Sequence, residues 1–251
     1  MSFIYKNFAQ VLNQYNYSFH AGDIIVGTIF SKETTGYLVD IGHQTGGYLP
    51  LEEIILTETN TSCQDLELNT TREFFILTYN IESQQLVVSI KRLTYIRAWD
   101  RIKQLKQENI TIQAYVRSIN KGGVLVEIEE IQGFIPNSHL PYKPSKKHFL
   151  YTNITCKLLV VHEQNNTLIC SVRCAIVSQL MNKLKVGSIL NSQVIGVTEF
   201  GVFFNIYNIP ALLHKSELKE EYISTFHIGT TWSIQIIHID TRQGRISVSL
   251  A

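Results

Sequence analysis

Apolar and polar positions alternate through most of this chain and predict short β-strands that each bury one face. In the C-terminal third the alternation predicts five strands, which we place at about 189–197, 201–207, 211–213, 231–239 and 245–250. Glycines stand at the expected bends. Five short strands within about 70 residues are typical of a small closed barrel, and closure leaves no strand edge unpaired.

The same pattern occurs three times along the chain. Each copy contains a glycine followed by a strand-like run, at 36–41, 123–128 and 201–206. A second shared motif follows shortly afterwards, at 47–50, 133–136 and 211–214. Each copy closes with a strand-like run whose last serines are Ser89, Ser171 and Ser249, spaced 82 and 78 residues apart. Three landmarks in one order indicate three repeats of one structural unit.

Two segments between the repeats break the β pattern. Residues 92–105 have apolar side chains at helical spacing with charges between them, namely Leu93, Ile96, Trp99, Ile102 and Leu105. Residues 174–184 are a shorter counterpart, and residues 3–15 are a further candidate helix. We therefore predict an all-β protein made of three tandem five-stranded OB-fold barrels joined by short linker helices. The predicted segments are an N-terminal extension (1–19), a first barrel (20–91), a linker helix (92–107), a second barrel (108–173), a second linker helix (174–185) and a third barrel (186–251).

The distribution of charge differs between the repeats. The whole chain has a formal net charge of only +1, from 22 basic and 21 acidic side chains. Residues 1–91 have 4 basic and 10 acidic side chains, residues 92–175 have 12 and 6, and residues 176–251 have 6 and 5. An acidic first repeat repels phosphate and suits a protein partner, whereas the basic second repeat attracts a polyanion.

Signals for catalysis, metal binding and membrane insertion are missing from the sequence. Three of the four cysteines, Cys156, Cys170 and Cys174, stand in apolar segments where a reduced thiol packs as a small hydrophobic group, and no Cys-x-x-Cys pair occurs. The carboxylates are scattered, with no recurring pair, no Walker-type glycine loop and no zinc-ligand spacing. No apolar run approaches the ~20 residues that span a bilayer. We expect no catalytic residue, no cofactor, no metal and no membrane partner, and hence a protein that is not an enzyme.

The third repeat contains a specific motif. It consists of Phe-Gly-Val-Phe at 200–203, Leu-Leu-His-Lys-Ser-Glu-Leu at 212–218, and Gly-Arg-Ile-Ser-Val-Ser at 244–249. This motif resembles the S1 RNA-binding domain, and the other two repeats resemble divergent members of the same domain. Residues 97–101 and 120–139 are similar to the ribosomal protein S1 family of cyanobacteria and plastids. The resemblance covers about 22–250, nearly the whole chain.

The resemblance implies a small-ribosomal-subunit protein that binds single-stranded mRNA and holds it at the ribosome for translation initiation. Its expected partners are mRNA and the proteins and rRNA of the small subunit, with docking through the acidic first repeat. A non-ribosomal RNA chaperone or RNA-stabilising protein would use the same sites, so this alternative stays open. A nuclease component is disfavoured because the repeats leave no room for a catalytic domain. Residue usage rich in Asn, Ile, Thr and Lys suits an AT-rich plastid genome, which favours the plastid (chloroplast) stroma, with the bacterial cytoplasm as the alternative.

The candidate RNA-binding residues of the third repeat are aromatic and polar. Proteins hold single strands by stacking bases on aromatic rings and by placing basic groups along the backbone. The positions that match the family motif are Phe200, Phe203, His214, Lys215, Asp240 and Arg245. Phe203 and Phe204 must point in opposite directions from one strand, so we expect one of them to be buried.

The other two repeats depart from this motif. The first has Thr35 and Leu38 in place of the two phenylalanines and Pro50 in place of the histidine, so we expect it to lack a stacking face. The second has Gly122 and Leu125 at the aromatic positions, and its basic residues are expected to compensate. Its candidate RNA-binding residues are Arg117, Lys121, Phe134, Lys143, Lys146 and Lys147.

Overall fold

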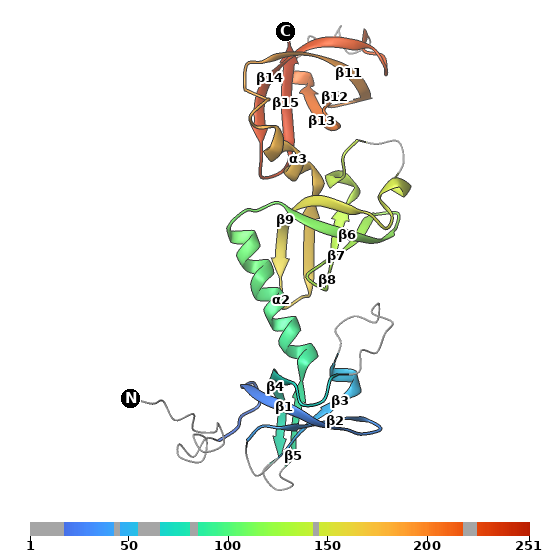
Figure 1. The fold of residues 1–251 in the computed structure, drawn as a ribbon. Helices are drawn as coiled ribbons and strands as arrows, with labels where there is room; N and C mark the ends of the chain where they lie inside the picture. Colours follow the sequence, from blue (N-terminus) through green and yellow to red (C-terminus); the bar gives the residue numbers. More distant parts are fainter. Residues whose placement is uncertain (1–17, 43–45, 55–65, 81–84, 143–145, 218–224) are drawn as a thin grey trace, which may run out of the picture. The chain divides into compact units, whose positions relative to one another are not determined.

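The computed structural model describes residues 18–42, 46–54, 66–80, 85–142, 146–217 and 225–251. Within them lie three closed barrels of five strands each (Figure 1). This confirms the predicted all-β fold of three OB-type barrels. The chain divides into two compact units, residues 1–100 and 101–251. The candidate helix at 3–15 lies outside the described residues.

The first barrel forms the described part of the N-terminal unit. Its strands are β1 (Ile24–Lys32), β2 (Gly36–Asp40), β3 (Gly47–Pro50), β4 (Thr71–Asn80) and β5 (Gln85–Ser89), with the short 3-10 helix η1 (Leu51–Glu53) after β3. They pair in the order β1-β2-β3-β5-β4, and β4 returns to β1 to close the barrel. Ile29, Val39 and Phe74 are completely buried inside it.

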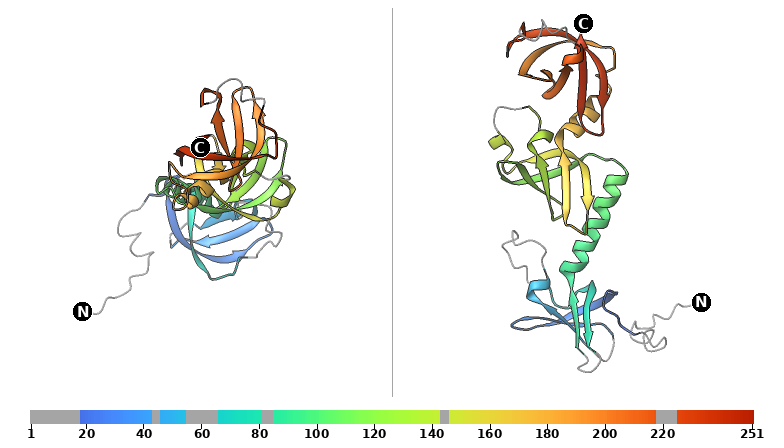
Figure 2. Two further views of the ribbon diagram at one scale, coloured as in Figure 1. Left: turned by 90° about the horizontal axis from the view of Figure 1, so that it is seen from above. Right: turned by 180° about the vertical axis from the view of Figure 1, so that it is seen from behind.

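The second barrel repeats this topology within the C-terminal unit. Its strands are β6 (Ile112–Ile119), β7 (Gly123–Ile128), β8 (Ile131–Pro136), β9 (Asn153–His162) and β10 (Thr167–Ser171). The 3-10 helices η2 (Asn137–His139) and η3 (Lys146–Phe149) lie between β8 and β9. Figure 2 shows the barrels from two further directions.

The third barrel consists of β11 (Ile189–Thr198), β12 (Gly201–Ile206), β13 (Ile209–His214), β14 (Thr231–Asp240) and β15 (Arg245–Leu250), with η4 (Lys215–Glu217) after β13. Four strands begin at the predicted residue, but β13 begins at Ile209 rather than at 211. The cause is a two-residue hairpin turn in which Tyr207 and Asn208 both have positive φ, 49° and 66°. Such a turn matches the twist of the flanking strands and lets pairing continue to its edge.

A steric requirement explains the glycine that opens the second strand of every repeat. A Cβ atom on this glycine would lie 2.1–2.3 Å from a carbonyl oxygen of the next strand. The three pairs are Gly36 with Leu49, Gly123 with Ile135, and Gly201 with Leu213. Two strands therefore approach each other more closely at this point than any side chain permits.

Each of the first two barrels leads directly into a helix. α2 (Ile90–Gln107) follows β5 and α3 (Val172–Leu180) follows β10, with no residue between strand and helix. The hydroxyl of Ser89 accepts a hydrogen bond from the backbone N–H of Arg92 at 2.8 Å, and that of Ser171 accepts one from Cys174 at 3.1 Å. These serine caps explain why both helices begin two residues before their predicted starts at 92 and 174.

Helix α3 also belongs to the third barrel. Val177 is completely buried in the core of that barrel, and Ile176 and Leu180 pack against it. At its other end, α3 meets the turn between β14 and β15, where a Cβ atom on Gly244 would lie 2.8 Å from the backbone nitrogen of Cys174. Gly244 has a φ of +65°, so both its backbone conformation and the contact favour glycine. Among the described residues no helix is both long enough and apolar enough to cross a membrane.

Candidate nucleic-acid interface

The outer face of β12 carries the first of the candidate rings. Phe204 is completely buried in the core, and Phe203 beside it points outward and is half-buried. The expected alternation of these two side chains is therefore observed, with Phe203 as the outer ring.

Phe200 lies next to Phe203 at the start of the same hairpin. Its side chain is 50% exposed, and the two ring centroids are 5.8 Å apart at an interplanar angle of 85°. This edge-to-face contact holds each ring in a fixed orientation. The exposed surface of Phe200 is thereby available as a stacking platform for a base.

His214 and Lys215 lie beside these rings. His214 pairs with Gly201 across the β12–β13 ladder, and the backbone N–H of Lys215 donates to the carbonyl oxygen of Phe200 at 3.0 Å. The backbone N–H of Ser216 donates to Nδ1 of His214 at 3.2 Å. Because a backbone N–H can only donate, Nδ1 is the acceptor, and the proton of the neutral ring resides on Nε2. The exposed imidazole thus offers one donor to a ligand.

Asp240 and Arg245 lie at the other end of this face. The two residues pair across the β14–β15 ladder. In the parallel pairing of β13 with β15, Leu212 lies opposite Ser247, so Arg245 and His214 are four positions apart, about 13 Å along the strands. The candidate residues of the third barrel therefore form a strip, with the aromatic rings and the histidine at one end and the exposed guanidinium at the other.

Asp240 has a clear local role in the turn that follows it. Its Oδ1 accepts hydrogen bonds from the backbone N–H groups of Arg242 at 2.8 Å and Gln243 at 3.0 Å. This pattern is typical of an aspartate that caps its own turn. Contact between this carboxylate and RNA stays a prediction.

The second barrel presents its aromatic ring from a different strand. Phe134 on β8 lies over Gly123, whose Cβ position is 2.7 Å from the ring, and close to Gly122. A hollow of about 270 Å³ lies beside it, lined by Leu125, Gln132, Phe134, Asn166, Thr167 and Leu168. The ring and the amides of Gln132 and Asn166 could stack on and hydrogen-bond to a base. Gln132 shares a face of β8 with Phe134 because it is two residues away, whereas Asn166 reaches the ring only through the fold of the barrel.

Arg117 is already engaged within the second barrel. Its Nε donates to a carboxylate oxygen of Glu127 at 2.6 Å, and its guanidinium carbon lies 5.0 Å from the centre of the Tyr115 ring. The hydrogen bond that Arg117 donates to Glu127 raises the pKa of Arg117 above its usual value. Glu127 offsets much of the charge that would attract phosphate, so the predicted contact of Arg117 with RNA is weakened.

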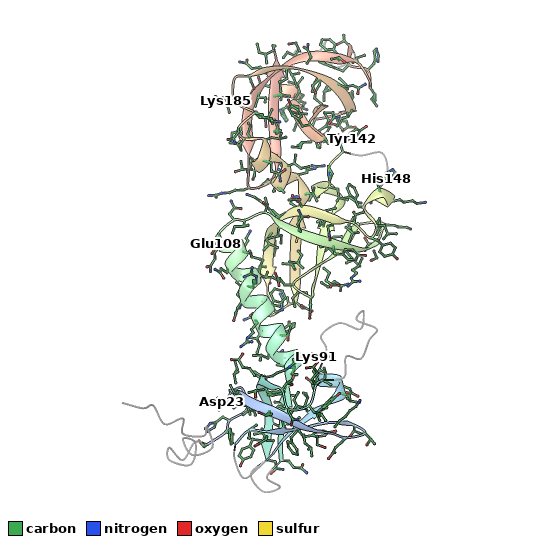
Figure 3. The ribbon with its side chains drawn as sticks, viewed as in Figure 1. Asp23, Lys91, Glu108, Tyr142, His148 and Lys185 are labelled. Carbon is green, nitrogen blue, oxygen red and sulfur yellow. The ribbon has the colours of Figure 1, made fainter. Side chains whose placement is uncertain are left out.

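The other basic candidates of this barrel gather near its η3 helix. Lys121 and Lys147 are exposed, and Nζ of Lys146 donates to the carbonyl oxygen of Lys121 at 3.4 Å. Figure 3 labels Tyr142, which comes before Lys143, and His148, which follows Lys147. Lys143 lies outside the described residues.

Comparison with known proteins decides the family. The S1 RNA binding domain matches residues 106–173 and 183–251. The chain is 44% identical to the small ribosomal subunit protein bS1c of Pyropia yezoensis over 99% of this chain and 96% of that protein. The chain belongs to the ribosomal protein S1 family. The small ribosomal subunit protein bS1c of Porphyra purpurea is also 44% identical, over 99% of this chain and 96% of that protein. The bS1A protein of Synechocystis is 39% identical, over 99% of this chain and 77% of that protein.

The first barrel has the strand order of the other two, and its assignment as a divergent S1 repeat stays a prediction. It lies outside the segments that match the S1 domain but inside the alignments with the S1-family relatives. Strand pairing places Pro50 opposite Gly36, as His214 lies opposite Gly201. Thr35 and Leu38 stand at the positions of Phe200 and Phe203, so the lack of a stacking face there stays a prediction, but Tyr48 occupies the position of Phe134. Its hydroxyl donates to Oγ1 of Thr35 at 2.7 Å.

Two residues of this S1-family chain that the sequence did not single out lie beside Arg245. Nδ1 of His139 lies 3.0 Å from Oγ of Ser171, and Nε of Arg173 donates to the carbonyl oxygen of Leu140 at 2.9 Å. Burial, reinforced by the positive charges of Arg173 and Arg245, lowers the pKa of His139. Burial and then the charge of Arg245 lower the pKa of Arg173. The strip on the third barrel thus ends beside a second cationic side chain from the preceding repeat.

No group of three or more potential metal ligands occurs within the part of the chain that the structure describes. Cys156, Cys170 and Cys174 are buried free thiols. A hydrogen bond with Cys156, together with burial, raises the pKa of Cys170. These cysteines pack in the interior as the sequence predicted.

Proposed function

We propose that this S1-family chain binds single-stranded RNA on the outer face of its third barrel and holds mRNA at the small ribosomal subunit for translation initiation. The observation that carries the proposal is the edge-to-face pair of exposed Phe200 and half-buried Phe203, with the donor of His214 beside it. The relatives that match almost the whole chain are named as small ribosomal subunit proteins, which supports the ribosomal part of the proposal.

The chemistry of this face favours binding with little sequence preference. Stacking of one base on an aromatic ring contributes ~1–3 kcal/mol and tolerates every base. Arg245 at the far end of the strip supplies a positive charge for the phosphate backbone. The hollow beside Phe134 offers a weaker second site, and tethering two such sites raises the overall avidity without new contacts.

Docking onto the small subunit is assigned to the first barrel. Its exposed carboxylates include those of Glu33, Asp40, Glu52 and Glu67. An acidic surface suits basic ribosomal proteins better than RNA. The proposed compartment is the plastid stroma, which the bS1c relatives of two red algae support.

The RNA-binding face is tested with the double variant Phe200→Ala, Phe203→Ala and a fluorescent single-stranded RNA. Loss of one stacked base weakens binding by about 5- to 150-fold. Tyr207→Asn is the matched control, because it removes an exposed ring from the same hairpin and asparagine tolerates the positive φ of this turn. Unchanged affinity in a folded double variant would move the main face to the second barrel. Failure of the wild-type chain to bind RNA at low salt would overturn the proposal.

The ribosomal role is tested by sedimentation. We expect the wild-type chain to co-migrate with small subunits in a gradient, and a Glu33→Lys, Glu67→Lys variant to lose co-migration while still binding free RNA. A wild-type protein that stays at the top of the gradient would argue for the non-ribosomal alternative.

A further inference from the structure

A cavity of about 330 Å³ lies in the C-terminal unit where the end of α2, strand β9 and the β14–β15 turn meet. Its lining includes three basic side chains from three different elements, Lys106, Lys157 and Arg242. Asn109, Cys174 and Thr241 add polar groups and a thiol. No carboxylate is among the described residues that line it.

Lys157 is the least expected member of this group. As a whole residue, Lys157 is only 9% exposed. Its ammonium group donates to Oδ1 of Asn109 at 3.3 Å, and the described residues provide it with no carboxylate. A buried cation is costly unless an anion or several hydrogen bonds compensate it. The one neutral amide at this distance supplies no opposite charge.

Lys106 and Arg242 also line the cavity, and only Lys106 is held there by hydrogen bonds. The ammonium of Lys106 donates to the carbonyl oxygens of Leu158 at 2.8 Å and Leu159 at 2.7 Å, which leaves one of its three protons for a ligand. Arg242 is exposed, and within the described residues its guanidinium makes neither a hydrogen bond nor an ion pair.

Two neighbouring carboxylates, those of Asp240 and Glu108, accept hydrogen bonds from groups outside the cavity lining or from their own turn. Asp240 accepts two backbone N–H groups of its own turn. Glu108 accepts a hydrogen bond from Nε2 of Gln104 at 3.0 Å and does not line the cavity. Burial raises the pKa of Cys174 and the charge of Asp240 raises it further, so this carboxylate is close enough to act on the hollow. Three cations against one carboxylate leave an excess of positive charge, which a bound anion would relieve.

We propose that this cavity binds a phosphate group of the RNA strand. The proposal rests on the proposed function, which supplies a polyanion at the adjacent strip. Arg242 lies in the β14–β15 turn and Arg245 opens the strand that follows it, so this turn connects the cavity with the cationic end of the strip. Its volume is at the lower end of the range for small-ligand sites, enough for one phosphate and its sugar. The cavity gives the strand a backbone anchor that reads no base.

The test compares Arg242→Gln and Lys157→Met with the control Lys185→Gln, using a single-stranded RNA without a terminal phosphate at several salt concentrations. Lys185, labelled in Figure 3, lies in the same unit but outside the cavity. Each cavity variant is expected to weaken binding about five- to tenfold at low salt. Each is also expected to reduce the slope of log K against log salt by about 0.7, the value for one lost phosphate contact on a single strand. The double variant should lose little more than either single variant, because both side chains hold the same phosphate.

The outcomes separate this proposal from the proposed function. If the wild-type chain binds RNA and both cavity variants keep the salt slope of Lys185→Gln, the cavity proposal is overturned while the RNA-binding function stands. Arg242→Gln keeps this result decisive even if Lys157→Met fails to fold, because Arg242 lies on an exposed turn. If the wild-type chain binds no RNA, thermal stabilisation by inorganic phosphate is measured at constant ionic strength. Stabilisation of wild type but not of Arg242→Gln would support a phosphate site that takes a free phosphate, and stabilisation of neither would refute the site.

Discussion

Replacement of Gly123 by alanine tests the steric reason for the repeated glycine. The new Cβ would lie 2.1 Å from the carbonyl oxygen of Ile135 and 2.7 Å from the Phe134 ring. A carbon and a carbonyl oxygen settle at about 3.3 Å or more, so β8 must move away from β7 by about 1 Å. Overpacking of this kind costs ~1–3 kcal/mol, and loss of one neighbouring ladder hydrogen bond adds ~1 kcal/mol. We expect the second barrel to lose about 2–4 kcal/mol of its free energy of unfolding.

Gly122→Ala is the matched control for this experiment. Its Cβ would lie 3.6 Å from the Phe134 ring, which is an ordinary van der Waals contact. The two variants make the same chemical change one residue apart, so they change the entropy of the unfolded chain equally. Urea unfolding followed by hydrogen exchange of the β7 and β8 amides localises the effect to this barrel. Equal unfolding free energies for the two variants would refute the steric argument.

Three further predictions concern the junction of the second and third barrels. The pKa of His139 is lowered in the folded state, so the unfolded state binds this proton first as pH drops, and the free energy of unfolding should fall as pH drops through about 6.5. His139→Gln should flatten this pH dependence. An unchanged pH profile in the variant would contradict the lowered pKa of His139. Ser171→Ala removes the N-cap of α3 and should cost ~1–2 kcal/mol in urea unfolding, whereas a cost near zero would show that the cap is unimportant. A fragment of residues 183–251 lacks Val177 and should melt well below a fragment of residues 172–251 in calorimetry; equal melting temperatures would show that α3 adds nothing to the third core.

The fold was predictable because its signals are local and repeated. The alternation of side chains along β12 is enough to place Val202 and Phe204 in the core of the barrel and Phe203 on its outer face. The repeated glycine then aligns the three copies, so that one well-matched repeat explains the other two. The exact helix starts were not predictable from apolar spacing, because they depend on the hydroxyls of Ser89 and Ser171, which end the preceding strands.

The site was predictable only in part, because several of its properties arise from residues far apart in the sequence. Arg117 was chosen for its charge, yet Glu127 on the adjacent strand already pairs with it. Tyr48 was overlooked because the first repeat was compared only at the positions where the third has its phenylalanines. Lys157 and Arg242 belong to different repeats, and no spacing rule within one repeat brings them together.

Because α3 packs with both the second and the third barrel, it affects how the C-terminal unit unfolds locally. The helix begins after the capping serine of the second barrel, and its Val177 lies in the core of the third. Local unfolding of the third barrel would therefore expose an apolar helix face that the second barrel still holds in place. Such an exposed face is costly, so the two barrels should open together as one cooperative unit rather than one at a time. An RNA strand bound to the third barrel would then protect the second from opening, although it need not touch it.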